Sequence, residues 1–198
     1  MSYELHYYQS GDKRPFLDWL EALRDRKTRA RIQTRIDRLA LGNFGNHRVL
    51  HGGIYELRID WGPGYRVYFA RIGNRLLLLL CGGDKTTQRA QKKPKAPSAP
   101  YEPWLIERLK DPAEAAVYLE AAIEEGDQGV LMLALRHVAQ AQGGVARIAR
   151  KSRLTREATY RMLSKGGNPE LKSLTALLGA AGLRLSVKPL ESQTEKAA

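Results

Sequence analysis

A short stretch rich in proline, lysine, alanine and serine, residues 92–100, divides this 198-residue chain into two parts of different character. Its sequence, KKPKAPSAP, has no apolar pattern, whereas the segments on both sides of it do. A proline-rich linker is semi-extended at roughly 3 Å per residue, so this one would span up to roughly 28 Å. The sequence therefore predicts two modules, residues 1–91 and 101–198, joined by a linker over residues 92–100.

The charge changes sign along the chain. Residues 1–100 carry 19 Lys and Arg against 9 Asp and Glu, residues 101–127 carry 2 against 8, and residues 128–198 carry 12 against 4. The resulting net charges of +10, −6 and +8 give the total of +12. Two separate basic blocks suggest two surfaces that face polyanions, although solubility alone is an alternative reason for such charge. The acidic block between them is a candidate to cover one of these surfaces.

Hydrophobic periodicity predicts helices packed on a sheet in residues 1–91. Residues 3–8 alternate and are rich in aromatic side chains, as in a strand. Apolar residues at helical spacing predict one helix that begins within residues 12–15 and another over residues 27–41. Three further strands are predicted at residues 53–60, 65–72 and 75–81, with turns at residues 62–64 and 73–74. We therefore expect an α+β module, a helix hairpin on an antiparallel sheet.

The alternation within these strands also places charged side chains together. Glu56 and Arg58 share one face of their strand, and Arg66 and Tyr68 share one face of the next. We expect Arg58, Arg66 and Tyr68 to crowd onto one open sheet face, with Lys85 just beyond the last strand. Guanidinium and ammonium groups hold phosphates and an aromatic ring can stack on a base, so this face suits RNA. The alternative is a solvated face with surface ion pairs such as Glu56–Arg58.

The motifs ELRIDWGPGYRVYF and LLLLLCGGDKTTQ carry a family resemblance over nearly all of residues 3–88. They resemble the RelE/ParE superfamily of toxins, and within it the HigB-like addiction module killer proteins. The resemblance implies ribosome-dependent mRNA cleavage, with gyrase as the alternative target that other superfamily members have. In such a reaction Arg58 and Arg66 would bind phosphate and stabilise the transition state, Lys85 would assist as a cation or proton donor, and Tyr68 would stack or orient. The C-terminal helix that these toxins usually carry is missing from the sequence after Gln88.

The second module reads as helical throughout. The sequence DPAE at residues 111–114 has an acidic N-cap, a proline at the first position and a glutamate three residues after the cap, which together predict a helix start. That helix extends to near Gly126 and has an acidic outer face, and another helix is predicted over residues 129–141. The segment VARIARKSRLTREATYRMLSKG then has the spacing of a helix-turn-helix. We therefore expect an all-α unit with an acidic helical segment over residues 101–127 and a helix-turn-helix DNA-binding region over residues 128–190.

Several residues of this segment have predicted positions. Leu154 fills the turn, Thr155 caps the second helix, and Tyr160 and Leu163 pack inward or partly so. The residues left to contact DNA bases and phosphates are Thr155, Arg156, Glu157, Thr159, Arg161 and Lys165. A small helical bundle with a basic face is the alternative reading.

The motifs YEPWLIERLKDPAEAAVYLEAAIEEGD and LTREATYRMLSKGGNPELKSLTALLGAAGLRLSV are similar to the HigA-like addiction module antidote proteins. This resemblance implies neutralisation of a toxin through protein contact and repression of the protein's own operon. We expect a homodimer on a palindromic operator, and contact between toxin and antitoxin either within one chain or between chains.

Together the two halves predict a fused toxin–antitoxin chain in which the toxin module precedes the antitoxin module. In this interpretation the chain is a DNA-binding regulator that neutralises its own toxin module. The alternatives are an active ribonuclease that its tethered antidote only tunes, and a fusion with neither activity. No Cys, His, Asp or Glu pattern suggests a metal site, and we expect no cofactor. The first residues lack the pattern of a signal peptide and no apolar run reaches the length of a membrane span, so we expect a cytoplasmic protein without membrane contact.

Overall fold

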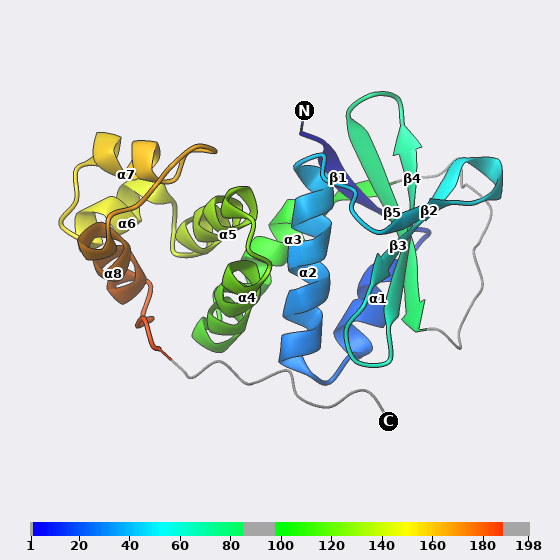
Figure 1. The fold of residues 1–198 in the computed structure, drawn as a ribbon, viewed down its shortest axis with the longest axis horizontal. Coiled ribbons are helices and arrows are strands. Elements are labelled where there is room, and N and C mark those ends of the chain that lie inside the picture. The colour runs from blue at the N-terminus through cyan, green and yellow to red at the C-terminus, as the bar shows by residue number, and fades with distance from the viewer. Residues whose placement is uncertain (1, 85–97, 188–198) are drawn as a thin grey trace.

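The computed structural model describes residues 2–84 and 98–187, and it places a sheet layer beside a group of helices with α2 standing between them (Figure 1). The first half contains helices α1 (Pro15–Ala22) and α2 (Arg26–Ala40) and a 3-10 turn at His51–Gly53. The strands are β1 (Glu4–Tyr8), β2 (His47–Val49), β3 (Ile54–Ile59), β4 (Tyr65–Ile72), β5 (Leu76–Asp84) and β6 (Ser98–Pro100). The second half contains α3 (Tyr101–Arg108), α4 (Pro112–Glu124), α5 (Gln128–Ala141), α6 (Val145–Lys151), α7 (Arg156–Met162) and α8 (Leu171–Ala180). The fold is mixed α+β, as predicted.

The six described strands form one sheet in the order β2-β3-β4-β5-β1-β6. The strands β2 to β5 follow one another as an antiparallel meander. The turn residues predicted its β3–β4–β5 part, whereas β2 was not predicted. The expectation of a wholly antiparallel sheet is wrong at β1, which pairs in parallel with β5. The α1–α2 hairpin separates β1 from the meander along the chain, so no tight turn fixes the direction in which β1 joins it.

The last part of the predicted linker is a strand. Residues 98–100 form β6 and pair antiparallel with β1, with His6 opposite Pro100 and Tyr8 opposite Ser98. The ring of His6 is also 3.0 Å from the Ser98 hydroxyl. An edge strand exposes unpaired backbone groups, and β6 satisfies those of β1. The second half therefore begins inside the sheet of the first, while residues 92–97 of the predicted linker lie outside the described residues.

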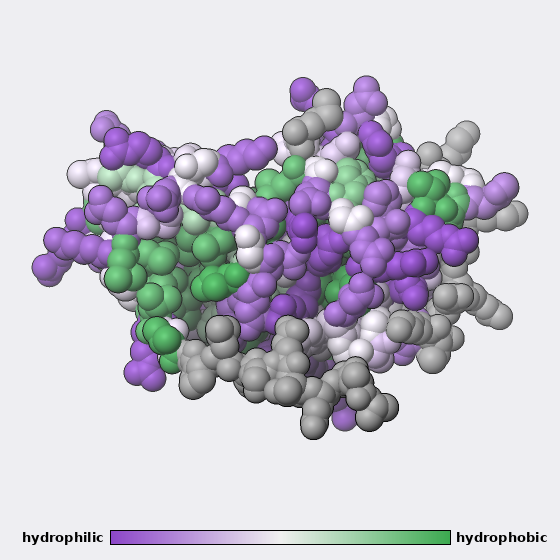
Figure 2. Space-filling model, in the orientation of Figure 1, coloured by the Kyte–Doolittle hydropathy of each residue, from purple (hydrophilic) through white to green (hydrophobic). Residues whose placement is uncertain are grey.

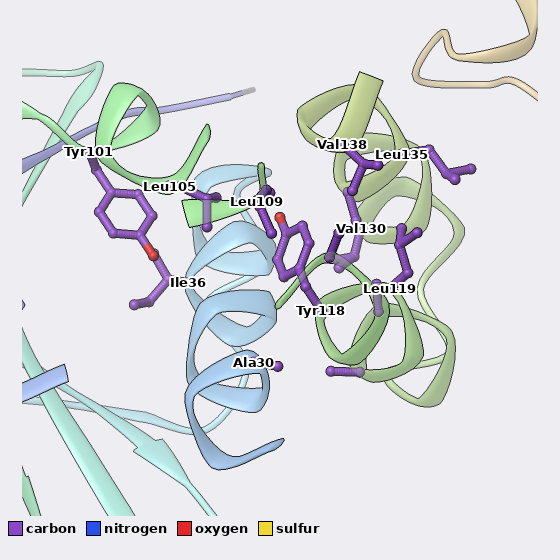
Figure 3. Close-up of a cluster of buried hydrophobic side chains, with 14 of the residues drawn as sticks. Ala30, Ile36, Tyr101, Leu105, Leu109, Tyr118, Leu119, Val130, Leu135 and Val138 are labelled. Atoms are coloured by element: carbon purple, nitrogen blue, oxygen red, sulfur yellow. The ribbon is translucent and has the colours of Figure 1, made fainter. Parts of the chain in front are cut away.

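Helices α1 and α2 cover one face of the sheet and form the main core with it. Phe16 and Leu20 of α1 and Ile36 of α2 are fully buried against Leu57 and Phe69 of the sheet. Each such side chain contributes roughly 1.5–3 kcal/mol when taken out of water. The same core continues into the second half, where Figure 3 shows Tyr101 and Leu105 approaching from α3 and Tyr118 reaching in from α4.

The opposite face of the sheet carries a smaller cluster of buried side chains, namely Ile54, Tyr68, Ala70, Leu78 and Leu80. The register between β4 and β5 shifts between Tyr68 and Phe69, which leaves Leu80 as an extra residue between Cys81 and Leu79. Such a bulge increases the local twist of a strand. Both faces of the central strands are thus buried at this point.

The start of α4 agrees with the predicted cap, and α5 begins with an acidic cap of the same kind. The Asp111 carboxylate accepts a hydrogen bond from the Ala113 backbone N–H, and Asp127 does the same for Gly129 at the start of α5. Gly126, at φ 71°, lies in the left-handed region and follows the end of α4. In the part of the chain that the structure describes, every helix is too short or too polar to cross a membrane.

Candidate functional site

Glu56 organises the charged side chains predicted on the sheet. Glu56 lies opposite Tyr68 in the β3–β4 ladder, and Arg58 lies opposite Arg66. The Glu56 carboxylate accepts from Arg58 Nε at 2.8 Å, from an Arg66 terminal nitrogen at 3.2 Å and from the Tyr68 hydroxyl at 3.3 Å. Two arginines directly opposite each other would repel, and the carboxylate between them offsets that repulsion. The structure therefore brings together Arg58, Arg66 and Tyr68 as predicted and adds Glu56.

This sheet face is less open than predicted. Tyr68 is only 4% exposed, because it packs with Ile54 and Leu80 in the smaller cluster. Glu56 is buried as well, whereas Arg58 retains about a third of its side-chain exposure. Lys85, and the position after Gln88 where a helix is missing from the sequence, lie outside the described residues.

The chemistry of this cluster follows from its burial. Burial raises the pKa of the Tyr68 phenol above its usual value, and the Glu56 charge raises it further. Tyr68 is therefore a neutral hydrogen-bond donor at neutral pH. The Arg66 Nε is buried with no hydrogen-bond partner among the described residues. The cluster offers guanidinium groups to an anion, with a carboxylate that fixes their orientation.

A second charged region joins the two halves through α2 and α4. Figure 2 shows hydrophilic residues over α2 on this side of the molecule. The carboxylate of Glu114 lies 2.5 Å from Arg29, 3.1 Å from Arg26 and 3.6 Å from Arg108. Side chains of Arg29 and Glu114 are only 8% and 9% exposed, so this is a buried ion pair that is costly to break by removing one partner. The glutamate predicted to complete a helix cap instead binds the first half.

A second group of ion pairs joins the C-terminal end of α4 to α2. Arg38 of α2 donates to Glu125 at 2.6 Å, and Arg31 pairs with Glu124. The acidic block of residues 101–127 therefore contacts the basic first half of the same chain. The contact includes Trp104 of α3, whose indole N–H donates to Glu21 of α1 at 2.7 Å.

Between these ion pairs lies a buried polar cluster that the sequence did not reveal. The Tyr118 hydroxyl donates to Asp37 of α2 at 2.5 Å and lies 2.9 Å from Nδ1 of His137 on α5. Burial raises the pKa of Asp37 to about 7, with the Tyr118 hydrogen bond opposing the rise. Burial also lowers the pKa of His137 to about 4, and the nearby Arg136 lowers it further. Both groups are therefore held in their neutral forms in mildly acidic solution.

The α6–α7 region presents most of the residues predicted to contact DNA. Thr155 caps α7 as expected, since its hydroxyl accepts from the Ala158 N–H at 3.2 Å. Exposed side chains on or just after α7 are those of Arg156, Glu157, Arg161 and Lys165. Leu163 is buried, as predicted.

Thr159 of α7 is oriented differently from the prediction, and its neighbour Tyr160 packs inward only in part. Thr159 is 0% exposed, and its hydroxyl donates to the Thr155 carbonyl at 2.8 Å, so it does not share the surface of the other predicted DNA contacts. Tyr160, expected to pack inward or partly so, is 50% exposed, with the Arg156 guanidinium 5.7 Å from its ring centroid. One residue along a helix turns the side chain by about 100°, which a pattern of mixed polarity does not determine.

The position of α7 is fixed by the helices beneath it. Arg136 of α5 donates to the Leu163 carbonyl at 2.6 Å, and Gln128 donates to the Gly167 carbonyl at 2.8 Å. A Cβ atom at Gly167 would lie 1.9 Å from the Met162 carbonyl oxygen, so this close approach requires glycine. In the turn before α7, Arg153 has φ 56°, a strained value for a residue with a side chain.

Comparisons with known proteins divide the chain at the same place. Residues 18–97 match the family described as phage derived protein Gp49-like, which is related to toxins, and residues 104–189 match the family described as "Probable addiction module antidote protein". An uncharacterized protein of Haemophilus influenzae is 51% identical over 73 residues, 37% of this chain and 74% of that protein. Another uncharacterized protein of the same organism is 29% identical over 84 residues, 42% of this chain and 86% of that protein. With a toxin-related segment followed by an antidote segment, the chain belongs to the toxin–antitoxin proteins.

Proposed function

We propose that this chain is a fused toxin–antitoxin protein. Its HigB/RelE-like RNA-cleaving toxin module is inhibited by a HigA-like antitoxin module within the same chain. The observation that carries the proposal is the array of ion pairs between α4 and α2, centred on Glu114 and Arg29. The proposed toxin module is residues 1–91, and the proposed antitoxin module is residues 101–198. Electrostatic complementarity of this kind also selects the partner and the register of docking.

The cluster around Glu56 supports an RNA-directed activity in the first half. Cleavage of RNA needs a 2′-hydroxyl aligned with the adjacent phosphate and stabilisation of charge that develops on the phosphoryl oxygens. Arg58 and Arg66 would bind that phosphate, and Glu56 would hold their guanidinium groups in place. Tyr68 would donate a hydrogen bond as a neutral phenol, and Lys85 would add positive charge.

The second half would bind operator DNA as a repressor through a helix-turn-helix formed by α6 and α7. Support comes from the capped start of α7 and from its exposed Arg156 and Arg161. A homodimer would place two copies of α7 on half-sites about one DNA turn, ~34 Å, apart. Thr159 is left out of this proposal because it is buried.

The proposed neutralisation is tested by opening the α2–α4 contact in the full chain. Glu114→Arg would set a fourth cation among Arg26, Arg29 and Arg108 and should release the toxin module. We expect the purified full chain to be silent in a ribosome-dependent mRNA cleavage assay and the variant to cleave. Glu107→Arg makes the same charge change on α3 at a side chain that is mostly exposed, and it should stay silent.

The alternatives give different results in the same assay. A full chain that already cleaves mRNA would favour an active ribonuclease that the antidote only tunes. A folded Glu114→Arg variant that does not cleave, but inhibits DNA gyrase in a supercoiling assay, would replace the RNA target with gyrase. Cleavage that survives Arg58→Ala in the Glu114→Arg background would remove the Glu56 cluster from the proposed active site.

A further inference from the structure

A cavity of about 320 Å³ lies beside α2 at the border between the two halves. Arg31, Arg35 and Arg38 line one side of it, and their spacing of four and three residues places them on one face of the helix. Asp60 and Trp61, from the segment after β3, line another side, and Glu125 contributes from the end of α4. Arg58 of the Glu56 cluster also lines the cavity, which therefore borders that cluster, although α2 packs on the sheet face opposite to the one that carries Glu56 and Arg66.

Arg35 is the most deeply placed cation of this cavity. It is 9% exposed, and one terminal nitrogen donates to the Phe44 carbonyl at 3.3 Å. The other terminal nitrogen is buried and has no hydrogen-bond partner among the described residues. Gly45, at φ 49°, makes this arrangement possible, because a Cβ atom there would lie 2.3 Å from the guanidinium. Burial lowers the pKa of Arg35 and the Glu125 charge opposes that change. One buried terminal nitrogen of this cation therefore remains without an acceptor among the described residues.

The two arginines at the rim are occupied by acids from the other half. Arg38 is bound by Glu125 at 2.6 Å, and Arg31 is bound by Glu124. Arg31 also lies over the Trp61 ring, with its guanidinium carbon 4.3 Å from the centroid. If the end of α4 withdrew, four arginines, including Arg58, would line the cavity beside the Asp60 carboxylate, which already accepts from Asn46 at 3.1 Å. The cavity would then be strongly cationic.

Guanidinium groups are matched in shape to phosphate oxygens, which they bind through pairs of hydrogen bonds. A cavity of this size admits a phosphate together with its sugar, and a partly exposed tryptophan at the rim provides a surface on which a base can stack. We propose that this cavity is a binding site for a nucleotide unit of single-stranded RNA, and that Glu124 and Glu125 occupy its phosphate position while the two halves are docked. RNA binding at α2 and docking of α4 then exclude each other, whether or not the protein cleaves RNA.

The test measures the affinity of the full chain for a short fluorescent oligouridylate by anisotropy at low salt. The double variant Glu124→Gln/Glu125→Gln removes the competing acids and should bind the oligonucleotide at least about tenfold more tightly, a change of ~1.4 kcal/mol. The control Glu107→Gln/Glu170→Gln removes the same two charges at exposed positions and should leave the affinity within about twofold. Equal gains in both double variants would mean that net charge alone attracts RNA, and would overturn the site.

Arginine substitutions in the Glu124→Gln/Glu125→Gln background then locate the binding. Arg38→Gln, at the rim, and Arg35→Lys, at the base, should each abolish the gain, while Arg75→Gln at the exposed start of β5 should retain it. Thermal melts of each variant identify the ones that remain folded, and Arg38→Gln carries the test if Arg35→Lys does not. Retained affinity in a folded Arg38→Gln variant would overturn the proposal. Binding of inorganic phosphate without any gain for the oligonucleotide, measured by calorimetry, would overturn the assignment to RNA.

Discussion

Replacing either Asp37 or His137 should change the pH dependence of stability, and the two replacements should act in opposite directions. Both side chains contact the hydroxyl of Tyr118 at the border between the halves. The other ionisable groups near them are Glu102, 3.9 Å from Nε2 of His137, Arg136 beside the histidine, and the buried Tyr101 phenol near Asp37. The cluster joins α2 of the first half to α4 and α5 of the second, so its protonation affects the docking of the halves.

The contribution of Asp37 decreases as the pH rises. Its pKa is 3.8 when unfolded and about 7 when folded, so between these values the folded chain holds a proton that the unfolded chain has lost. At about 1.4 kcal/mol per pH unit, this group removes about 4 kcal/mol of stability between pH 3.8 and pH 7. The stabilisation is complete below pH 3.8 and absent above pH 7.

The contribution of His137 has the opposite sign. Its pKa falls from 6.5 to about 4 on folding, so between these values the unfolded chain binds the proton and the folded chain does not. This group therefore adds about 3 kcal/mol of stability as the pH rises from 4 to 6.5. In the wild-type protein the two slopes largely offset each other from pH 4 to 6.5.

Each single substitution should expose the slope of the group that remains. Asp37→Asn keeps an oxygen that can accept from Tyr118, and its free energy of unfolding should rise by about 3 kcal/mol from pH 4 to 6.5 relative to a protein with neither group. His137→Gln should instead lose about 4 kcal/mol between pH 4 and 7 relative to the same protein. Urea denaturation followed by circular dichroism at half-unit pH intervals measures both.

The double variant Asp37→Asn/His137→Gln is the protein with neither group, and subtracting its profile cancels ionisable groups elsewhere. Asp12→Asn replaces an exposed aspartate and serves as the matched control. If Asp37→Asn and His137→Gln both leave the wild-type pH profile unchanged, as the control should, the buried cluster does not hold its groups neutral and the reasoning is refuted.

Three further substitutions test other contacts of the structure. Glu114→Ala leaves Arg29 buried without its partner and should lower the free energy of unfolding by about 3–5 kcal/mol; a loss under 1 kcal/mol in urea denaturation would show the pair to be solvated. Gly167→Ala places a methyl group against the Met162 carbonyl and should lower the free energy of unfolding by about 2–3 kcal/mol. Arg153→Gly relieves a left-handed backbone conformation and should raise the free energy of unfolding by up to about 1 kcal/mol. Thermal unfolding curves measure both changes. On the proposed DNA-binding role, Arg156→Ala should weaken binding to the operator by about 1–3 kcal/mol in a mobility-shift titration; unchanged affinity would remove α7 from the interface.

Much of the fold follows from short-range patterns in the sequence. The alternation in β3 and β4 predicted which side chains share a face, and the structure places Arg58, Arg66 and Tyr68 together as a result. Glu56 could have been found by the same rule, since it lies two residues before Arg58 and opposite Tyr68. From the sequence it reads only as a member of a surface ion pair, because alternation does not reveal how deeply a face is buried.

The features that the sequence did not predict depend on contacts between distant segments. Strands β2 and β6 have three residues each, too few to show a period of two, and β6 forms because β1 has a free edge. Asp37 lies in a helix rich in arginine, where an acid normally reads as an exposed ion-pair partner. Asp37 is buried in a contact with Tyr118 of α4, which lies 81 residues later in the sequence.

The position of the docked helices affects how the proposed restraint could be released. The ion pairs and buried contacts of α3 and α4 lie on α1 and α2, across the sheet from Glu56, so release requires opening the α2–α4 contact rather than uncovering the sheet face. A tether of this kind gives an effective concentration on the order of millimolar, so a contact of about micromolar intrinsic affinity would be closed about a thousand times more often than open. Loss of one exposed ion pair, worth about 0–1 kcal/mol, would change that ratio little. Loss of the buried Glu114–Arg29 pair, at about 3–5 kcal/mol, would bring the populations of the closed and open states to within about tenfold of each other. The cleavage assay on Glu114→Arg therefore tests the ion pair whose loss changes this ratio most.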